Sequence, residues 1–341
     1  MTEPMDPKPI LDVGFGFWSS KVLLSAVELG VFTELAKGGR TRDELGAALG
    51  LHPRGSMDLF DALVALGFLQ RESHGERAIY TNTELTDHFL DRAKPSYVGG
   101  MLEMLEARLY RYWGDLTEAL RTGKPQNEIK HTGAPMFETL YSDESRLEGF
   151  MNAMQGISRP NFETFAEVFD FSRYKTLCDV GGANGLLSML VAQAHPHMRC
   201  ISADLPPATA IAARKIQAAG LDDRVSVQSL DFFNDPLPRA DVITMGMILH
   251  DWNLEKKMHL VKAAYNALPA GGAFVAIENI IDDARRDNAF GLMMSLNMLI
   301  EFGEAFDFTG ADFDGWCRQV GFRGTQVIHL AGPASAAIAY K

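Results

Sequence analysis

The chain has few cysteines and no clustered metal ligands. Its 341 residues include three cysteines, Cys178, Cys200 and Cys317, which are scattered and odd in number. Disulfide frameworks need paired cysteines, and structural zinc sites need closely spaced Cys and His side chains. The sequence therefore predicts neither a disulfide framework nor a metal site. It favours a reducing compartment, and we expect a cytoplasmic protein.

Positive charge is also scarce. The chain has 32 Lys and Arg residues against 44 Asp and Glu residues, which gives a formal net charge of −12. Proteins that bind nucleic acid or anionic membranes use an excess of basic side chains to neutralise phosphates. The composition therefore argues against nucleic acid and membrane surfaces as the main partners.

Long apolar runs and a signal peptide are not expected either. The most apolar stretch that we identify, Phe290 to Phe302, is interrupted by Ser295, Asn297 and Glu301. It is shorter than the ~20 residues that a membrane span requires. The first ten residues hold two acids and three prolines, unlike the apolar core of a signal peptide. We expect a soluble enzyme with a chain long enough for about two domains.

The N-terminal region is rich in apolar residues. Residues 10–36 follow a helical pattern with more apolar surface than one helix face needs, so we expect a second chain to bury the remainder. A capping box at 41–44, a helix at about 55–66 and a hairpin at 68–80 follow in winged-helix order. We predict a winged-helix dimerisation domain over residues 1–95 and a helical linker over 96–170.

A winged helix also occurs in DNA-binding regulators, which is the alternative of another class. The candidate recognition helix, Gly55–Leu66, carries Asp58 and Asp61 and no Lys or Arg. Such a helix is poorly suited to face phosphates. We therefore favour dimerisation over DNA binding for this domain.

Strands and helices alternate from Thr176 onward, which predicts βαβ units and a parallel sheet. The chain ends in two strand patterns around Gly332-Pro333, which we interpret as a hairpin closing the sheet. An α/β, Rossmann-like sheet of seven strands with an antiparallel end resembles a class I methyltransferase domain, here residues 171–341. The expected strands are Thr176–Val180, Arg199–Ala203, Val225–Gln228, Asp241–Met245, Ala273–Glu278, Gly324–Leu330 and Ala334–Tyr340.

A glycine-rich turn follows the first of these strands. Gly181, Gly182 and Gly185 lie between the strand and a helical pattern, a context in which backbone N–H groups approach a nucleotide. Asp179 precedes the glycines. A carboxylate there would repel a pyrophosphate but suits a cation, so we favour S-adenosylmethionine over a dinucleotide. The spacing also differs from the Gly-x-Gly-x-x-Gly pattern of dehydrogenases.

Further acids follow the next two strands. Asp204, followed by Leu205, lies about 20 residues beyond the glycines, where a carboxylate suits a ribose diol. Asp231 and Phe232 follow the third strand and would offer an acceptor and a flat wall to adenine. Each acid also has an ordinary interpretation, as a helix-terminal or loop residue. Three strand ends in succession favour a cofactor site.

The fourth strand leads to His250 in the run His-Asp-Trp. Because ligands bind beyond the carboxyl ends of the strands, this histidine would face the reactive end of the cofactor. An imidazole is a suitable general base near neutral pH. The alternative is a histidine that merely caps the helix starting near Asn253.

These motifs together resemble the caffeic acid and acetylserotonin type of small-molecule O-methyltransferase, including its bacterial natural-product branch. The resemblance covers nearly the whole chain. It implies an S-adenosylmethionine-dependent, metal-free enzyme and a homodimer formed through the N-terminal domain. The motifs are Asp179–Gly185, Ala203–Pro206, Asp231–Phe233, His250-Asp251-Trp252 and Ile277–Asn279.

The resemblance also implies roles for individual residues. His250 would take the proton of a phenolic or enolic hydroxyl, and Glu278 would orient its imidazole. Asp307 stands where the family usually has a second acid, a Glu, and its basic neighbour is replaced by Phe308. Ser158 matches a position at the methionine end of the cofactor.

We expect the acceptor pocket to come from the helical linker and from the helix at 289–302, whose Met and Phe side chains would suit an aromatic or polycyclic metabolite. Core or dimer packing is an equally good account of any one of them. C-, N- or S-methylation, or a relative that only keeps the cofactor, remains open within the same fold. The pocket candidates are Phe150, Met154, Ile157, Met294, Met298 and Phe302.

Overall fold

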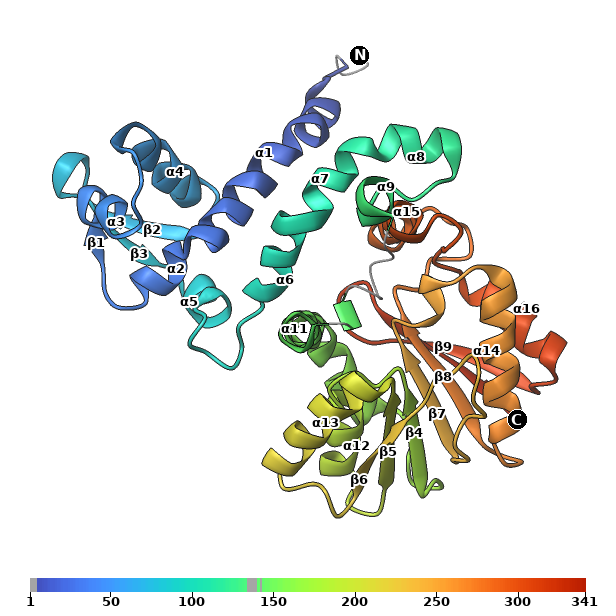
Figure 1. Ribbon diagram of the computed structural model, residues 1–341. Coiled ribbons are helices and arrows are strands. Elements are labelled where there is room, and N and C mark those ends of the chain that lie inside the picture. The colour runs from blue at the N-terminus through green and yellow to red at the C-terminus, as the bar shows by residue number, and fades with distance from the viewer. Residues whose placement is uncertain (1–4, 134–139, 142) are drawn as a thin grey trace. The chain divides into compact units, whose positions relative to one another are not determined.

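The computed structural model describes residues 5–133, 140–141 and 143–341, and the chain forms two compact units, Met1–Arg111 and Tyr112–Lys341. Figure 1 shows both units. The region 96–170, predicted as a linker domain, is divided between them, because its first helices pack with the N-terminal unit. The predicted domain boundaries at 95 and 170 stay a prediction.

The N-terminal unit is mainly helical and carries a small sheet. The three strands pair in the order β1-β3-β2. The helix, helix, hairpin order predicted from the sequence is present, with a two-residue strand added in front. Its elements are α1 (Lys8–Leu29), α2 (Val31–Leu35), β1 (Arg40–Thr41), α3 (Arg42–Ala48), α4 (Pro53–Ala65), β2 (Leu69–Glu72), η1 (Gly75–Arg77), β3 (Ile79–Asn82), α5 (Glu84–Leu90), α6 (Gly99–Met104) and η2 (Leu105–Leu109).

Helix α4 begins two residues earlier than predicted, and the difference concerns DNA binding. The helix begins at Pro53, because proline is well tolerated in a first turn, and it therefore includes Arg54. The Arg54 guanidinium forms an ion pair with Asp58 one turn later. The expectation that this helix carries no basic residue was wrong. The one that it does carry is paired with an acid.

Helix α1 leaves much of its apolar surface exposed within the unit. Val13 is 82% exposed and Trp18 is 59% exposed, whereas Leu24, Ala26 and Val27 near its C-terminal end are buried. By length and composition the 22-residue helix α1 could also cross a membrane, a candidate that we did not consider from the sequence, whereas the helix Ala289–Phe302 is apolar but shorter. The excess apolar surface predicted for residues 10–36 is present.

The C-terminal unit begins with helices and continues into one large sheet. The helices before the sheet are η3 (Trp113–Asp115), α8 (Leu116–Thr122), α9 (Glu128–Thr132) and α11 (Glu144–Val168), with α7 (Tyr110–Tyr112) at the junction of the units. The strands and the helices between them are β4 (Thr176–Val180), α12 (Leu186–Ala194), β5 (Arg199–Asp204), α13 (Pro206–Ala218), β6 (Val225–Ser229), β7 (Val242–Gly246), η4 (Leu249–Asp251), α14 (Leu254–Ala267), β8 (Ala273–Glu278), α15 (Ala289–Phe302), α16 (Gly310–Val320), β9 (Gly324–His329) and β10 (Ser335–Tyr340).

The seven strands run in the order β6-β5-β4-β7-β8-β10-β9. The pairs from β6 to β8 are parallel, and β10 is antiparallel to both β8 and β9. The predicted strands lie within one or two residues of the observed ones. The antiparallel strand, however, does not end the sheet: β10 inserts between β8 and β9, and β9 forms the edge.

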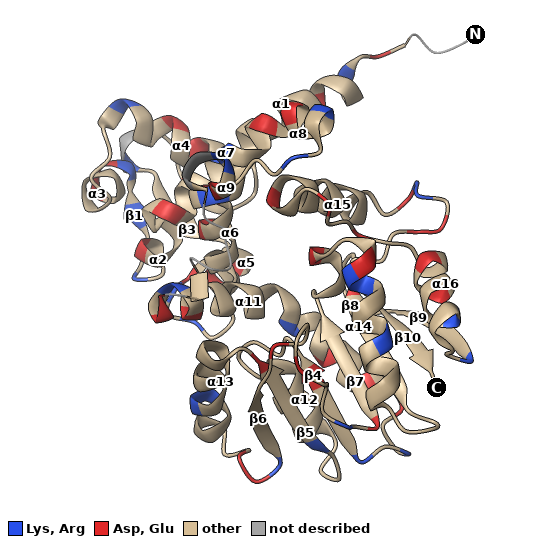
Figure 2. Ribbon diagram, turned by 45° about the vertical axis from the view of Figure 1, so that its right-hand side comes forward, with Lys and Arg blue, Asp and Glu red and all other residues tan. Residues whose placement is uncertain are grey.

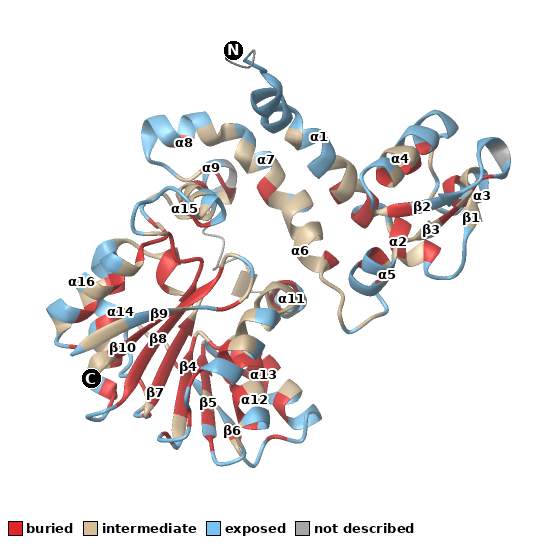
Figure 3. Cartoon of the chain, turned by 180° about the vertical axis from the view of Figure 1, so that it is seen from behind, coloured by how far each residue is buried: buried red, intermediate tan, exposed pale blue. Residues whose placement is uncertain are grey.

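Two helical layers cover this sheet. Helices α12, α13 and the end of α11 bury one face, and α14 and α16 bury the other (Figure 1). Figure 3 shows the central strands as the most buried part of the unit. Because both faces are covered, the central strands are mostly apolar. The carboxyl ends of these strands form the candidate site.

Candidate active site

The carboxyl ends of β4, β5, β7 and β8 lie along one edge of the sheet, at the position where doubly wound sheets bind ligands. Acidic residues recur in the loops at this edge (Figure 2). The sequence-predicted groups Asp179, Asp204, His250 and Glu278 are all carried by these ends. All four side chains are buried.

The glycine turn after β4 is closely packed. A Cβ atom at Gly181 would come within 2.3 Å of Ile248 Cδ1, and one at Gly182 within 2.4 Å of Ser202 Oγ. Gly181 and Gly185 also have φ angles of 71° and 79°, which favour glycine. The backbone N–H groups of Gly181 and Gly182 donate to the carbonyl of Ala203. Close packing against Ile248 and Ser202 therefore requires glycine at positions 181 and 182 of the turn.

Asp179 lies inside the sheet, just before this turn. Its Oδ1 accepts a hydrogen bond of 2.7 Å from the hydroxyl of Thr244 on β7. Burial raises the pKa of Asp179 to about 7, although the Thr244 hydrogen bond acts in the opposite direction. A nearby cation would stabilise the ionised carboxylate.

Asp204 at the end of β5 holds the glycine turn. Its Oδ2 accepts from the N–H of Ala183, and its Oδ1 accepts from the N–H of Leu205 and from the hydroxyl of Tyr141, at 2.7–3.1 Å. Burial raises the pKa of Asp204, and the two backbone hydrogen bonds limit this rise. The carboxylate thus links the ends of β4 and β5 and can accept one further hydrogen bond, at Oδ2.

Asp231 and Phe232 follow β6 at the same edge. The Asp231 carboxylate accepts from the side chain of Asn234 and the N–H of Phe233, which lower its pKa. The rings of Phe232, Phe233 and Trp252 contact one another edge to face. An acidic group thus lies beside an aromatic cluster.

His250 is presented by the short helix η4. Between β7 and η4, Met247 has a φ of 55° and its N–H donates to Ile277 on β8. A positive φ is unfavourable for a side chain as large as methionine, and such strain is frequent at functional sites. The turn directs η4 across the end of β8, and His250 becomes 4% exposed.

Glu278 contacts the backbone of η4 rather than the imidazole. Its Oε1 accepts from the N–H groups of Ile248, Leu249 and His250, at 3.2, 2.9 and 3.4 Å. Its Oε2 lies 4.0 Å from His250 Nδ1, which is too far for a hydrogen bond. Glu278 therefore does not orient the imidazole by direct contact, as the resemblance implied. Its carboxylate accepts hydrogen bonds from the N–H groups at the start of η4 and acts on the imidazole through its charge.

Asp307 and Asp251 complete the surroundings of the imidazole. Asp307 Oδ1 lies 3.4 Å from His250 Nδ1, and Asp251 Oδ1 lies 3.3 Å from Nε2. Among the described residues, His250 Nδ1, Glu278 Oε2 and both Asp307 oxygens are buried without a hydrogen-bond partner. Buried polar atoms are rarely left unpaired, so this cluster is suited to hold a proton or a ligand.

The acids dominate the charge state of His250. Burial alone would lower its pKa, but the charges of Glu278, Asp251 and Asp307 raise it to about 10. Burial raises the pKa of Asp251 to about 6 and that of Glu278 to about 7. The imidazole is therefore a cation at neutral pH in the absence of ligands.

Two family models match the chain. One, described as an O-methyltransferase domain, covers residues 113–323, and the other, an O-methyltransferase dimerisation domain, covers residues 11–92. The chain belongs to the O-methyltransferase family. It is an enzyme of the methyltransferase class, with the family's dimerisation domain at its N-terminus.

Individual known proteins resemble the chain over nearly its whole length. The tetracenomycin polyketide synthesis 8-O-methyl transferase TcmO of Streptomyces glaucescens is 38% identical and aligns with 100% of this chain and 98% of its own. Human N-acetylserotonin methyltransferase, solved in complex with SAM, is 31% identical, covers 100% and 99% of the two chains and has a TM-score of 0.90. The N,N-dimethyltransferase OxyT of Streptomyces rimosus is 32% identical over 96% of this chain and 95% of its own.

The expected pocket residues of this methyltransferase lie on two helices. Phe150, Met154, Ile157 and Ser158 lie on α11 and are half-buried. Gln155 on the same helix accepts from Asn184 in the glycine turn at 2.5 Å, so this part of α11 adjoins the turn. The role of Ser158 at the methionine end stays a prediction.

Helix α15 supplies the other three pocket candidates and packs against η4, which carries His250. Met298 is 5% exposed, which agrees equally well with core packing, whereas Met294 and Phe302 are half-buried. The pocket assignment of all six residues stays a prediction.

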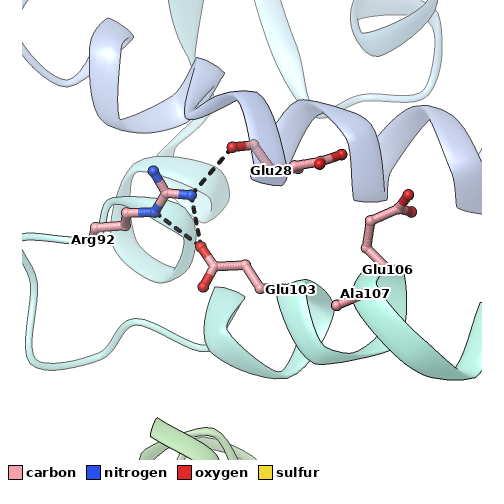
Figure 4. Close-up of a pocket in the computed structure, with 5 residues that line it drawn as sticks. All are labelled: Glu28, Arg92, Glu103, Glu106 and Ala107. Atoms are coloured by element: carbon pink, nitrogen blue, oxygen red, sulfur yellow. Dashed lines mark hydrogen bonds and ion pairs between the residues drawn. The ribbon is translucent and has the colours of Figure 1, made fainter. Parts of the chain in front are cut away.

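A pocket of another kind lies in the N-terminal unit. Arg92 there donates to Glu103 and to the carbonyls of Val27 and Glu28, as Figure 4 shows in part. The remaining lining residues, Glu106 and Ala107, come from η2. This pocket contains neither the glycine turn nor His250, so it is separate from the candidate site at the sheet edge.

Sequence reasoning missed two polar residues at the candidate site. Asp251 lies in the His-Asp-Trp motif but received no role. Lys257 on α14 is 0% exposed, and its signal was positional: it shares a helix face with Leu260, Val261 and Ala264, all buried. A lysine among the apolar positions of a helix is unusual, so Lys257 could have been recognised from the sequence.

Proposed function

We propose that this chain is an S-adenosylmethionine-dependent O-methyltransferase that acts on a phenolic or enolic hydroxyl of a small aromatic or polycyclic metabolite, with His250 as general base. The observation that supports it most is the imidazole flanked by carboxylates at the same sheet edge as the glycine turn. Similarity to a polyketide 8-O-methyl transferase at 38% identity supports the acceptor class.

The residues present fit the cofactor. The glycine turn and Asp204 lie together at the ligand-binding edge of the sheet, and Asp204 keeps one acceptor site, at Oδ2, for a ribose hydroxyl. Asp231 and Phe232 would receive adenine, and Asp179 provides negative charge near the turn. When bound, S-adenosylmethionine supplies an electrophilic methyl group carried on a sulfonium cation.

Residues of the chain itself accept the hydroxyl proton of the acceptor. Two carboxylates, Glu278 and Asp307, face His250 Nδ1, whereas Asp251 alone faces Nε2, so we assign the proton of the neutral imidazole to Nδ1. The lone pair at Nε2 is then available for the hydroxyl proton of the acceptor. When the second proton arrives, Asp251 lies 3.3 Å from Nε2 and stabilises the imidazolium. Orientation of the acceptor by the α11 and α15 side chains supplies a further part of the rate.

The pH dependence of the rate should show that the bound cofactor lowers the pKa of the His250 base. His250 has a pKa of about 10 without ligands, and a sulfonium cation nearby favours the neutral imidazole and so lowers it. We expect kcat/KM for the acceptor to rise with pH to a plateau whose midpoint lies below 10 and above His's ordinary ~6.5. Rates from pH 6 to 10.5 with two acceptors of different phenol pKa measure this. A midpoint that follows the acceptor's pKa would contradict the assignment.

A methyl-donor assay tests the proposed function directly. The purified enzyme would be incubated with labelled S-adenosylmethionine and a panel of phenols, hydroxyquinones, amines and thiols, with and without EDTA. We expect label on phenolic oxygen and unchanged turnover with the chelator. Transfer to nitrogen alone would favour the N-methylation alternative, which the 32% identity to an N,N-dimethyltransferase keeps relevant. Loss of activity with EDTA would argue for a metal at the His250 cluster.

We propose that the chain forms a homodimer through α1, whose exposed apolar residues lie within the segment covered by the dimerisation model. Replacing Phe15 and Trp18 together with Glu should convert a dimer into a monomer, because both rings are about half exposed in the single chain. Light scattering coupled to size exclusion measures the mass. Gln70→Glu, at an exposed position on β2, is the matched control. A mass that is unchanged by the double substitution would exclude this surface.

The cytoplasm remains the proposed location. The three cysteines are free and buried, which suits a reducing compartment. DNA regulation is disfavoured by the acid-paired Arg54 and by the net charge of −12.

A further inference from the structure

Lys257 is a buried cation next to the proposed base. It lies on α14 and is fully buried. Its Nζ donates to the carbonyl of Trp252 and, at 2.8 Å, to the carbonyl of Phe306, and lies 3.7 Å from the centre of the Phe306 ring. A lysine is almost never fully buried unless it is paired, so this placement calls for a reason.

The two carbonyls belong to the segments that carry the proton-handling groups. Trp252 directly follows His250 and Asp251, and Phe306 directly precedes Asp307. One ammonium group therefore joins the end of η4 to the loop before α16. The distance between His250 Nδ1 and Asp307 Oδ1, 3.4 Å, depends on how these two segments are held.

The charge of Lys257 also balances the acids around the imidazole. The charged groups that face this region are Asp251 from η4, Glu278 from β8, Asp307 from the loop before α16, and Glu301 from α15, which acts on Asp251. Burial lowers the pKa of Lys257 to about 8, and the charges of Glu278, Asp307 and Asp251 counteract the burial. Lys257 in turn lowers the pKa of Asp251.

We propose that Lys257 is a positioning residue for methyl transfer: it fixes the His250 segment against the Asp307 segment and limits the net negative charge around the imidazole. This inference rests on the proposed role of His250 as base. Without the ammonium group, the cluster binds its protons more tightly, because removing a positive charge favours every neighbouring protonated form. The base is then harder to deprotonate and less well oriented.

Lys257→Met tests this, because methionine keeps a similar length and removes the charge. The pKa of the His250 ring, followed by NMR in the cofactor-free enzyme, should rise by about one unit, and the pH–rate profile should shift to higher pH by a similar amount. On the lower limb of the pH–rate profile turnover should fall about tenfold, because below the pKa a shift of one unit reduces the neutral fraction of the base to about a tenth of its former value. Lys262→Met, at an exposed position of the same helix, should change neither quantity.

A purely structural role gives a different result. Loss of thermal stability with an unchanged His250 pKa and an unchanged pH profile would overturn the proposal. If Lys257→Met does not fold, Lys257→Gln replaces it, because the amide can still donate to one of the carbonyls without charge. The wild-type enzyme adds a readout that needs no variant: the Lys257 ammonium protons should be protected from exchange with solvent, and rapid exchange would also overturn the proposal.

The test separates this proposal from the proposed function. The NMR titration needs no acceptor and no turnover. A shifted His250 pKa without methyl transfer to any oxygen would leave the positioning effect in place and reject the O-methyltransferase mechanism. Methyl transfer to oxygen with an unshifted His250 pKa in the Lys257 variant would support the O-methyltransferase mechanism and reject the positioning role of Lys257.

Discussion

His250→Ala should lower kcat for methyl transfer by about 10²- to 10⁴-fold, the usual contribution of a positioned general base. The reason is geometric: in the described structure the imidazole, with carboxylates beside both of its nitrogens, is the group at this sheet edge best placed to accept a hydroxyl proton. Single-turnover rates with a phenolic acceptor measure the loss. The pH dependence of the wild type should disappear in the variant at the same time.

Cofactor binding should survive this substitution. Removing an imidazolium next to the site of a sulfonium cation takes away a repulsive charge, so the Kd for S-adenosylmethionine should stay the same or fall. Calorimetry measures it. His329→Ala, at an exposed position on the edge strand β9, is the matched control and should behave as wild type. Normal turnover of His250→Ala with its true acceptor would reject the base assignment.

Asp204→Ala should weaken S-adenosylmethionine binding by about 100-fold. Hydrogen bonds to a charged group contribute roughly 1.5–3 kcal/mol each, and this carboxylate both holds the N–H of Ala183 and is placed to accept from the ribose. The substitution therefore loosens the glycine turn and removes a ligand contact. Calorimetric titration of the variant gives the change in Kd.

Two further variants separate the loosening of the glycine turn from the loss of the ligand contact. Asp204→Asn keeps an oxygen for Ala183 but adds a donor, so it should retain the folded turn and still lose affinity. Asp222→Ala, at an exposed position between α13 and β6, should leave Kd unchanged. If Asp204→Ala bound the cofactor as tightly as wild type, the ribose assignment would be wrong.

The sequence predicted the sheet well because the signals there are local. A strand such as Thr176–Val180 is an apolar run closed by a glycine turn, and its observed bounds are the same. The acids at the strand ends could be found because parallel strands bring their carboxyl ends to one edge. Topology therefore predicts that Asp179, Asp204 and His250 lie at one edge, whereas the role of His250 as base came from the family resemblance.

The details around the imidazole could not be predicted, because they depend on tertiary contacts. That Glu278 binds the backbone of η4 instead of the ring depends on the turn at Met247. The link made by Lys257 joins segments about 50 residues apart, Trp252 and Phe306. No local pattern contains that information, although a lysine among the apolar positions of α14 was a usable clue.

The insertion of β10 between β8 and β9 has a consequence for the order of folding during synthesis. In the sheet Ser335 pairs with Glu278, the last residue of β8. The strand that carries one of the acids of the active site therefore lacks a neighbour until a segment almost 60 residues further along has left the ribosome. The N-terminal unit has no such dependence, since its own sheet closes within residues 40–82. We infer that the newly made chain acquires its dimerisation unit first and its catalytic centre last.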